Sequence, residues 1–222
     1  MSAETFLTLG SFLKWIGIIL LPLLLLPLLT LVAPKAFARL SLILSEQIDR
    51  VTSAFLSVAI VAAICLFLLQ LAVVIASYAF ALSWTWLSEL VIYAFATVFM
   101  LGAASALKDD AHVRVDILRP RFGENGRNWV ELAGTYLFLF PICIRILTTG
   151  EQGLARAWSL FEGSRESDGL PLLFLFKTLV PIFAILLIAQ GLSIALKAAL
   201  RLTGEIAPED HLKSTTSDHY GA

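Results

Sequence analysis

The chain alternates long apolar segments with short polar stretches. Five apolar segments can be drawn, at residues 12–32, 51–82, 86–107, 129–149 and 172–200. Each is close to or above the roughly 20 residues that a helix needs to cross the hydrocarbon core of a bilayer. At about 1.5 Å per residue, the second and fifth exceed that core, so both helices should tilt or project beyond it. The pattern predicts an all-α integral membrane bundle.

Composition supports a membrane protein and excludes several other classes. Hydrophobic residues make up 59% of the 222 residues and charged residues 15%, with a net charge of −1, whereas soluble domains are about 45–50% apolar. A net charge of −1 does not indicate the basic surface that nucleic-acid binding requires. Cys65 and Cys143 lie inside apolar segments, and His112, His211 and His219 lie outside them, so neither haem nor structural zinc is expected. We expect no cofactor, no metal and no enzymatic activity.

The polar stretches divide the chain into four parts. Residues 1–34 are predicted to hold an additional N-terminal hydrophobic helix, and residues 51–203 a four-helix domain. Residues 35–50 are predicted to form an amphipathic helix in the plane of the cytoplasmic interface, and residues 204–222 a disordered cytoplasmic tail. The apolar positions of the amphipathic helix recur at helical spacing: Phe37, Leu40, Leu44 and Ile48.

The first hydrophobic segment allows three interpretations. Pro22 and Pro27 interrupt it, and the residues Ala36-Phe37-Ala38 are compatible with a signal-peptidase site. Its length and the scarcity of basic residues before it favour a retained, Pro-kinked spanning helix. A cleaved signal and a re-entrant hairpin stay open as alternatives.

The distribution of Lys and Arg predicts the orientation of the helices. The 35–50 stretch, the 108–129 loop and the C-terminal end carry eleven of these residues, and the opposite side carries three. The positive-inside rule therefore predicts a periplasmic N-terminus and a cytoplasmic C-terminus. Tryptophans near the ends of the segments are expected to be membrane-interface anchors: Trp84, Trp86, Trp129 and Trp158.

Three ionisable residues fall inside apolar segments, each at about the same predicted depth. Glu89, Arg145 and Lys177 all lie between one and two turns from the predicted outer boundary. We expect Glu89 to pair with Arg145 or Lys177, because an uncompensated charge at this depth is costly. Independent snorkelling of the two cations and an ion relay are the alternatives. Gln70 and Gln190, nearer the middle, are expected to form interhelical hydrogen bonds or to face a partner subunit.

One stretch has the appearance of a signature. The third apolar segment runs directly into charge in the sequence FMLGAASALKDDAHVRVDI, residues 99–117. This phrase resembles the small permease (DctQ-like) subunit of tripartite ATP-independent periplasmic (TRAP) transporters, with Ser105 in place of an aromatic residue. Other positions carry the resemblance as well: Ile48-Asp49-Arg50, Glu89, Glu162-Gly163-Ser164, Gly169-Leu170-Pro171 and Lys177.

The resemblance implies a role as a transporter subunit in a bacterial inner membrane. It implies a heterodimer with a large permease subunit, transient contact with a periplasmic substrate-binding protein, and sodium-driven uptake of an organic acid or related small solute. The small subunit would brace the large one, and the 150–171 loop would be a landing surface for the binding protein. His112, Arg114 and Asp116 would either brace a turn or form a docking surface.

Two other classes of function stay open at this point. A self-sufficient small carrier or channel would move solute without a partner. A membrane enzyme or a redox anchor would need histidine ligands, or a nucleophile and a base, at a common depth in the membrane. The apolar segments offer no such set.

Overall fold

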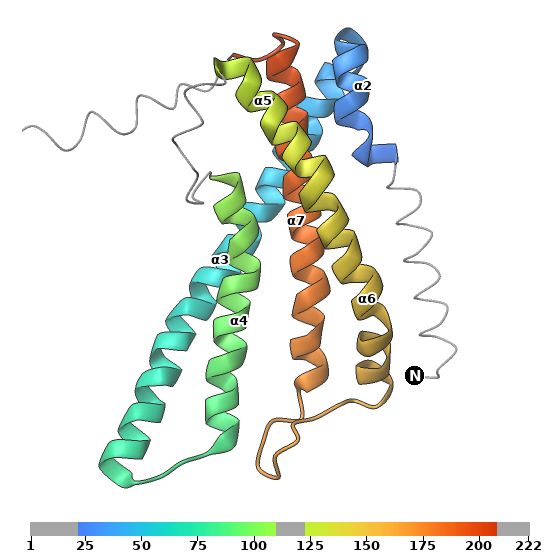
Figure 1. The fold of residues 1–222 in the computed structure, drawn as a ribbon. Coiled ribbons are helices and arrows are strands. Elements are labelled where there is room, and N and C mark those ends of the chain that lie inside the picture. The colour runs from blue at the N-terminus through green and yellow to red at the C-terminus, as the bar shows by residue number, and fades with distance from the viewer. Residues whose placement is uncertain (1–21, 110–122, 208–222) are drawn as a thin grey trace, which may run out of the picture.

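The fold is a bundle of long helices (Figure 1). The computed structural model describes residues 22–109 and 123–207. The elements of the described part are α2 (Leu26–Val32), α3 (Pro34–Phe80), α4 (Thr85–Lys108), α5 (Gly123–Gly134), the π-helical turn η2 (Thr135–Leu139), α6 (Phe140–Ser159) and α7 (Leu173–Leu202). Four helical stretches are long and apolar enough to cross a membrane: α3, α4, residues 125–159 and α7. The prediction of an all-α membrane bundle is confirmed.

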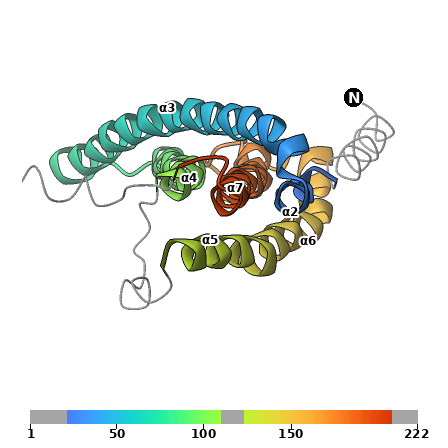
Figure 2. The same ribbon diagram turned by 90° about the horizontal axis from the view of Figure 1, so that it is seen from above.

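Helix α7 lies at the centre of the bundle. Seen from above, α3 and α4 lie on one side of it and α5 and α6 on the other (Figure 2). Accordingly, 44% of the residues in the most apolar window of α7 are buried, against 6% in that of α3. The loops at 81–84 and 160–172 lie at one end of the bundle, here called the loop end. The opposite end is called the basic end, because α4 and α7 both run toward it and carry Lys108 and Arg201 in their last turns.

Helix α3 is one continuous helix of 47 residues. The amphipathic stretch at 35–50 and the second apolar segment are therefore not separate helices in the structure. Pro34 begins the helix, and no Gly or Pro interrupts it before Ala81, which ends it in the left-handed conformation. The helix bends gradually around the bundle, as the arc in Figure 2 shows. Its first half buries small and hydroxyl side chains: Ala38, Ser41, Ser45 and Thr52.

The junction of α5 and α6 contains the π-helical turn η2. Pro141 is the second residue of α6, and because proline has no N–H, the carbonyl of Leu137 loses its usual helical donor. The turn packs against Gly191 of α7, where an added Cβ would lie 2.2 Å from Leu139 Cδ2. A glycine at this position therefore allows close approach of the two helices.

The C-terminal end of α6 also differs from the sequence prediction. The expected segments 86–107 and 172–200 correspond closely to α4 and α7. The segment expected to end at Thr149 continues through Gly150 and Gly153 to Ser159. Residues 12–21 of the first hydrophobic segment and residues 208–222 of the tail lie outside the described residues, and α2 covers only the end of that segment.

Candidate functional site: polar clusters that join the helices

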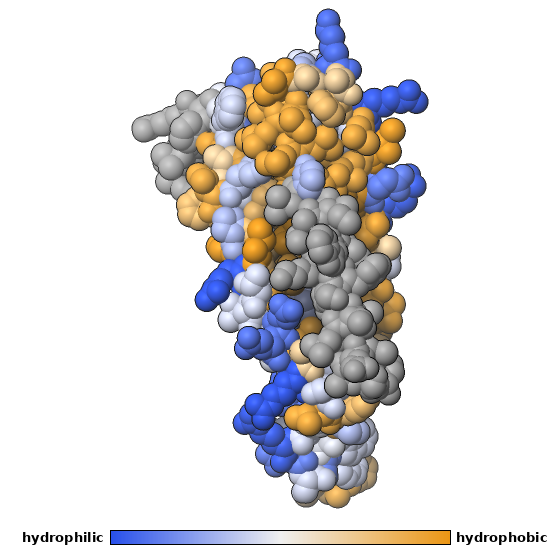
Figure 3. All heavy atoms as spheres, turned by 90° about the vertical axis from the view of Figure 1, so that its right-hand side faces the viewer, coloured by the Kyte–Doolittle hydropathy of each residue, from blue (hydrophilic) through white to orange (hydrophobic). Residues whose placement is uncertain are grey.

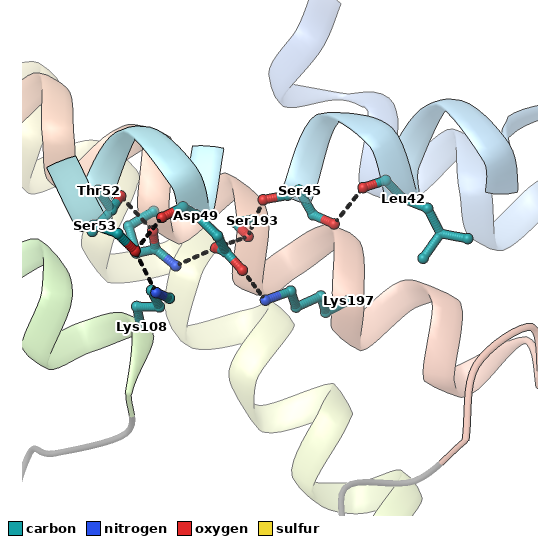
Figure 4. A network of polar contacts seen from close by, with 9 residues as sticks. Leu42, Ser45, Asp49, Thr52, Ser53, Lys108, Ser193 and Lys197 are labelled. Carbon is teal, nitrogen blue, oxygen red and sulfur yellow. Dashed lines mark hydrogen bonds and ion pairs between the residues drawn. The ribbon is translucent and has the colours of Figure 1, made fainter. Parts of the chain in front are cut away.

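A group of polar side chains joins α3 to α7 in the half of the bundle toward the basic end. The Asp49 cluster consists of Asp49, Thr52, Gln190, Ser193 and Lys197, of which Figure 4 labels all but Gln190. Asp49 Oδ1 accepts hydrogen bonds from Gln190 Nε2 at 3.1 Å and Ser193 Oγ at 2.8 Å. Asp49 Oδ2 forms an ion pair with Lys197 Nζ at 2.5 Å. Thr52 Oγ1 donates to Gln190 Oε1 at 2.8 Å.

The Asp49 cluster is mostly shielded from solvent. Gln190 and Ser193 are fully buried and Thr52 is 1% exposed. Buried polar groups are stabilising only when their hydrogen-bonding capacity is filled, and here two helices fill it mutually. The cluster therefore fixes α3 against α7.

Helix α4 joins the same region through Ser53. Lys108 Nζ donates to Ser53 Oγ at 2.7 Å, and Ser53 Oγ donates to the carbonyl oxygen of Asp49 at 2.8 Å (Figure 4). Three helices are thus connected by side chains near the basic end. Arg201 of α7 and Glu131 of α5 approach to 3.9 Å and connect a fourth element.

Sequence reasoning identified only Gln190 of this cluster as a candidate and missed the other four members: Asp49, Thr52, Ser193 and Lys197. Ser193 and Lys197 follow Gln190 at positions three and seven further along one face of α7. Ser45, Asp49 and Thr52 form a matching polar row on α3. Two polar rows on two apolar helices are the signal that could have identified the contact.

At the loop end, Glu89 of α4 holds the α6–α7 loop, residues 160–172. Glu89 Oε2 accepts the backbone N–H of Leu170 at 2.6 Å, and Oε1 accepts the hydroxyl of Ser164. Ser164 N–H donates to the carbonyl of Leu170 at 2.9 Å, which closes the loop on itself. The carboxylate thereby connects the α3–α4 hairpin to the α6–α7 hairpin.

The expectation that Glu89 pairs with Arg145 or Lys177 is wrong for this structure. The loop folds back over Glu89 and supplies uncharged donors, which the sequence pattern does not reveal. Lys177 forms an ion pair with Glu162 at 2.5 Å instead. The two acids and Lys177 therefore all serve to anchor the same loop.

Asp168 adds another contact between this loop and α4. The backbone N–H of Thr85 donates to Asp168 Oδ2 at 3.3 Å. Hydrogen bonds from the side chain and backbone of Thr85 hold the pKa of the Asp168 carboxyl below its ordinary value. Because the folded-state pKa is lowered, the contact stabilises the loop above the ordinary pKa near 3.8 and is lost as the pH falls through the lowered value.

Replacing Gly169 with alanine is expected to detach part of the loop. A Cβ there would lie 2.2 Å from Ser164 Oγ and 2.8 Å from Glu89 Oε1, so the two groups that anchor the loop would have to move. Limited proteolysis should cut the 160–172 region faster in Gly169→Ala. Gly153→Ala in α6 is the matched control, because its added Cβ meets nothing within 4 Å. Equal cleavage rates for the two variants would show that the close contact around Gly169 is unimportant.

Arg145 lies much deeper than the sequence suggested. Because α6 continues to Ser159, Arg145 is about 14 residues, or about 21 Å, from the C-terminal end of its helix. Its side chain is exposed. Among the described residues no carboxylate lies within ion-pair distance of it.

The remaining candidates occupy several environments. Gln190 forms the interhelical bonds described above, whereas Gln70 is exposed in a shallow apolar groove between α3 and α4. Trp84 and Trp86 are exposed at the start of α4, as interface anchors would be, and Trp129 is exposed in the middle of α5. Trp158 differs, because its indole N–H donates to Thr178 Oγ1 at 2.9 Å and its ring packs edge-on against Phe174. His112, Arg114 and Asp116 lie outside the described residues.

The two clusters have the character of structural contacts between helices. Across the described part of the chain, no three His, Cys, Asp or Glu side chains gather as a metal site would require. Each acid in the clusters is engaged by donors from a neighbouring element. The arrangement can hold helices and a loop in place, and its chemistry is that of hydrogen bonds and ion pairs.

Comparison with known proteins identifies the family. Residues 66–201, more than half of the chain, match the family model of the DctQ component of tripartite ATP-independent periplasmic transporters. The matched region runs from the middle of α3 to the end of α7 and so includes Glu89, the loop it holds and the α7 part of the Asp49 cluster. Comparisons with curated proteins and with solved structures gave no match. The chain belongs to the DctQ family and is the small membrane component of a TRAP transporter.

Proposed function

We propose that this chain braces a large permease subunit during sodium-driven uptake of an organic acid or related small solute. In this proposal a periplasmic binding protein delivers the solute and the large subunit carries it. The small subunit contributes a fixed surface in the bacterial inner membrane. Membership of a tripartite transporter family supports the existence of both partners.

One observation carries the bracing role. The polar side chains of the Asp49 cluster and of Glu89 are directed at neighbouring elements of this same chain. Polar groups that bind a passing solute must exchange partners, whereas these groups are occupied by helix-to-helix and helix-to-loop contacts. Such contacts favour a rigid support over a transport pathway.

The proposed orientation follows the positive charges. The basic end, with Lys108, Lys197 and Arg201, is assigned to the cytoplasm, and the loops at 81–84 and 160–172 to the periplasm. We assign the N-terminus to the periplasm, on the proposal that the first hydrophobic segment spans the membrane, and the C-terminus to the cytoplasm. We further propose that His112, Arg114 and Asp116, on the cytoplasmic side, contribute to the contact with the large subunit.

Affinity purification of the tagged chain from its native membrane tests this function. Mass spectrometry should find a large multi-spanning permease in near-equal amount, and transport in liposomes should require both subunits. Solute uptake by the purified chain alone would contradict the bracing role and support a self-sufficient carrier. Recovery of the chain alone, in a detergent that preserves other complexes, would contradict the subunit assignment.

A further inference from the structure

Helix α6 exposes a row of polar side chains along one face. This α6 polar face consists of Arg145, Thr148, Thr149, Gln152 and Arg156, all of which are exposed. The spacing of three and four residues places them on one side of the helix. The opposite side of α6 is buried in the bundle and carries Phe140, Cys143 and Ala157.

The polar face extends to the middle depth of the bundle. Near one end of α6, Trp158 bonds to Thr178 of α7, and just before its other end, Leu139 lies against Gly191. Counted along the antiparallel helices from these two contacts, Arg145 lies level with residues between Ile185 and Gly191 of α7, a range that includes Leu187.

Leu187 is the midpoint of α7 between its two lysines. Lys177 and Lys197 are separated by about 20 residues, or about 30 Å, which equals the thickness of the hydrocarbon core. We take the two lysines as the boundaries of the core, which places Arg145 near the centre of the membrane. A charged side chain at that depth is costly against lipid, and it normally faces a protein partner or a water-filled cavity.

The other exposed face of the bundle has the opposite character. Along α3, the exposed side chains are large and apolar, including Ile64, Phe67, Leu68 and Leu71. Such a surface is compatible with lipid tails. Figure 3, which looks at the side of the molecule on which α6 lies in Figure 1, shows hydrophilic residues over much of its lower part, toward the loop end.

We infer that the α6 polar face is the docking surface for the large permease subunit, and that α3 faces lipid in this region. This inference rests on the proposed function. The partner surface is a membrane helix that presents a carboxylate at the depth of Arg145 and small or hydroxyl-bearing side chains opposite Thr148 and Thr149. A guanidinium suits this role because its fork of donors can bind a carboxylate through two hydrogen bonds.

Site-directed photocross-linking in the intact complex tests the surface. Single cysteines are introduced as Thr149→Cys on α6 and Ile64→Cys on α3, in a background with Cys65→Ala and Cys143→Ala, and labelled with benzophenone maleimide. We expect a cross-link to the large permease from position 149 at least about tenfold stronger than from position 64. A yield at 149 no greater than at 64, or cross-linking only to a second copy of this chain, overturns the inference.

Substitution of Arg145 supplies a second readout. Arg145→Leu should leave the membrane yield of the chain unchanged or higher, because leucine is favourable at this depth, yet lower recovery of the large permease at least about tenfold. Arg145→Lys should retain part of the recovery of the large permease. Normal recovery with Arg145→Leu contradicts the inference while the bracing role stands. If no large permease is recovered with the unsubstituted chain, the proposed function itself is contradicted.

Discussion

Replacing Asp49 with alanine is expected to lower the free energy of unfolding by about 2 kcal/mol, because it leaves buried donors without acceptors. Gln190, Ser193 and Lys197 all lose their common partner, and the first two are fully buried. Lys197 is partly exposed and can recover some hydration, which keeps the expected loss below that of a fully buried ion pair. Thermal or denaturant unfolding of the chain in detergent measures this effect.

Glu46→Ala is the matched control for Asp49→Ala. Glu46 lies on α3 within one turn of Asp49, carries the same charge and is exposed, so its loss should change stability by less than about 0.5 kcal/mol. The double variant Asp49→Ala/Lys197→Ala should be less destabilised than the sum of the two single variants, because each removes the same contact. Additive losses would contradict the ion pair, and equal stability of Asp49→Ala and Glu46→Ala would contradict the whole cluster.

Glu89→Ala is expected to release the 160–172 loop and to reduce the yield of assembled complex. The substitution leaves the Leu170 N–H and the Ser164 hydroxyl without their acceptor, at a cost of about 1–3 kcal/mol. A loss of about 1.4 kcal/mol corresponds to a tenfold change in an equilibrium. Proteolysis within the loop, which follows its local opening, should therefore accelerate about tenfold.

Glu166→Ala provides the comparison within the same loop. The Glu166 side chain is exposed, so its removal should leave both cleavage rate and assembly near those of the original chain. Glu89→Gln keeps one acceptor oxygen, so its loop cleavage rate and its yield of assembled complex should lie between those of Glu89→Ala and Glu166→Ala. Normal assembly and normal loop protection with abolished transport in Glu89→Ala would favour the ion-relay interpretation over a structural one.

The positions of α4 and α7 could be predicted closely from sequence. Each is a single apolar run of suitable length, and both are bounded by polar or turn-forming residues: Ser83, Lys108, Pro171 and Thr203. Their ends agree with the prediction because the transition from apolar to polar residues coincides with the end of the helix.

Helix α6 shows where that reasoning fails. Its apolar run stops near Thr149, but the helix continues over Gly150 and Gly153 because Ala157 and Trp158 pack against other parts of the structure. Tertiary packing thus overrides the low helix propensity of two glycines. The same extension changes the depth assigned to Arg145, and with it the role that we propose for this residue.

The sequence by itself determined that this is an all-α membrane protein, and its signature carried the family resemblance. Both follow from local information: the length of apolar runs, and residues adjacent in the chain. Only the tertiary structure decided that Glu89 holds a loop, that Lys177 pairs with Glu162, and that Asp49 pairs with Lys197. Partners such as Asp49 and Lys197 are far apart in sequence. Several cations have similar predicted depths in the apolar segments, so the hydrophobic pattern cannot show which cation pairs with which acid. Helix register and loop path make that choice.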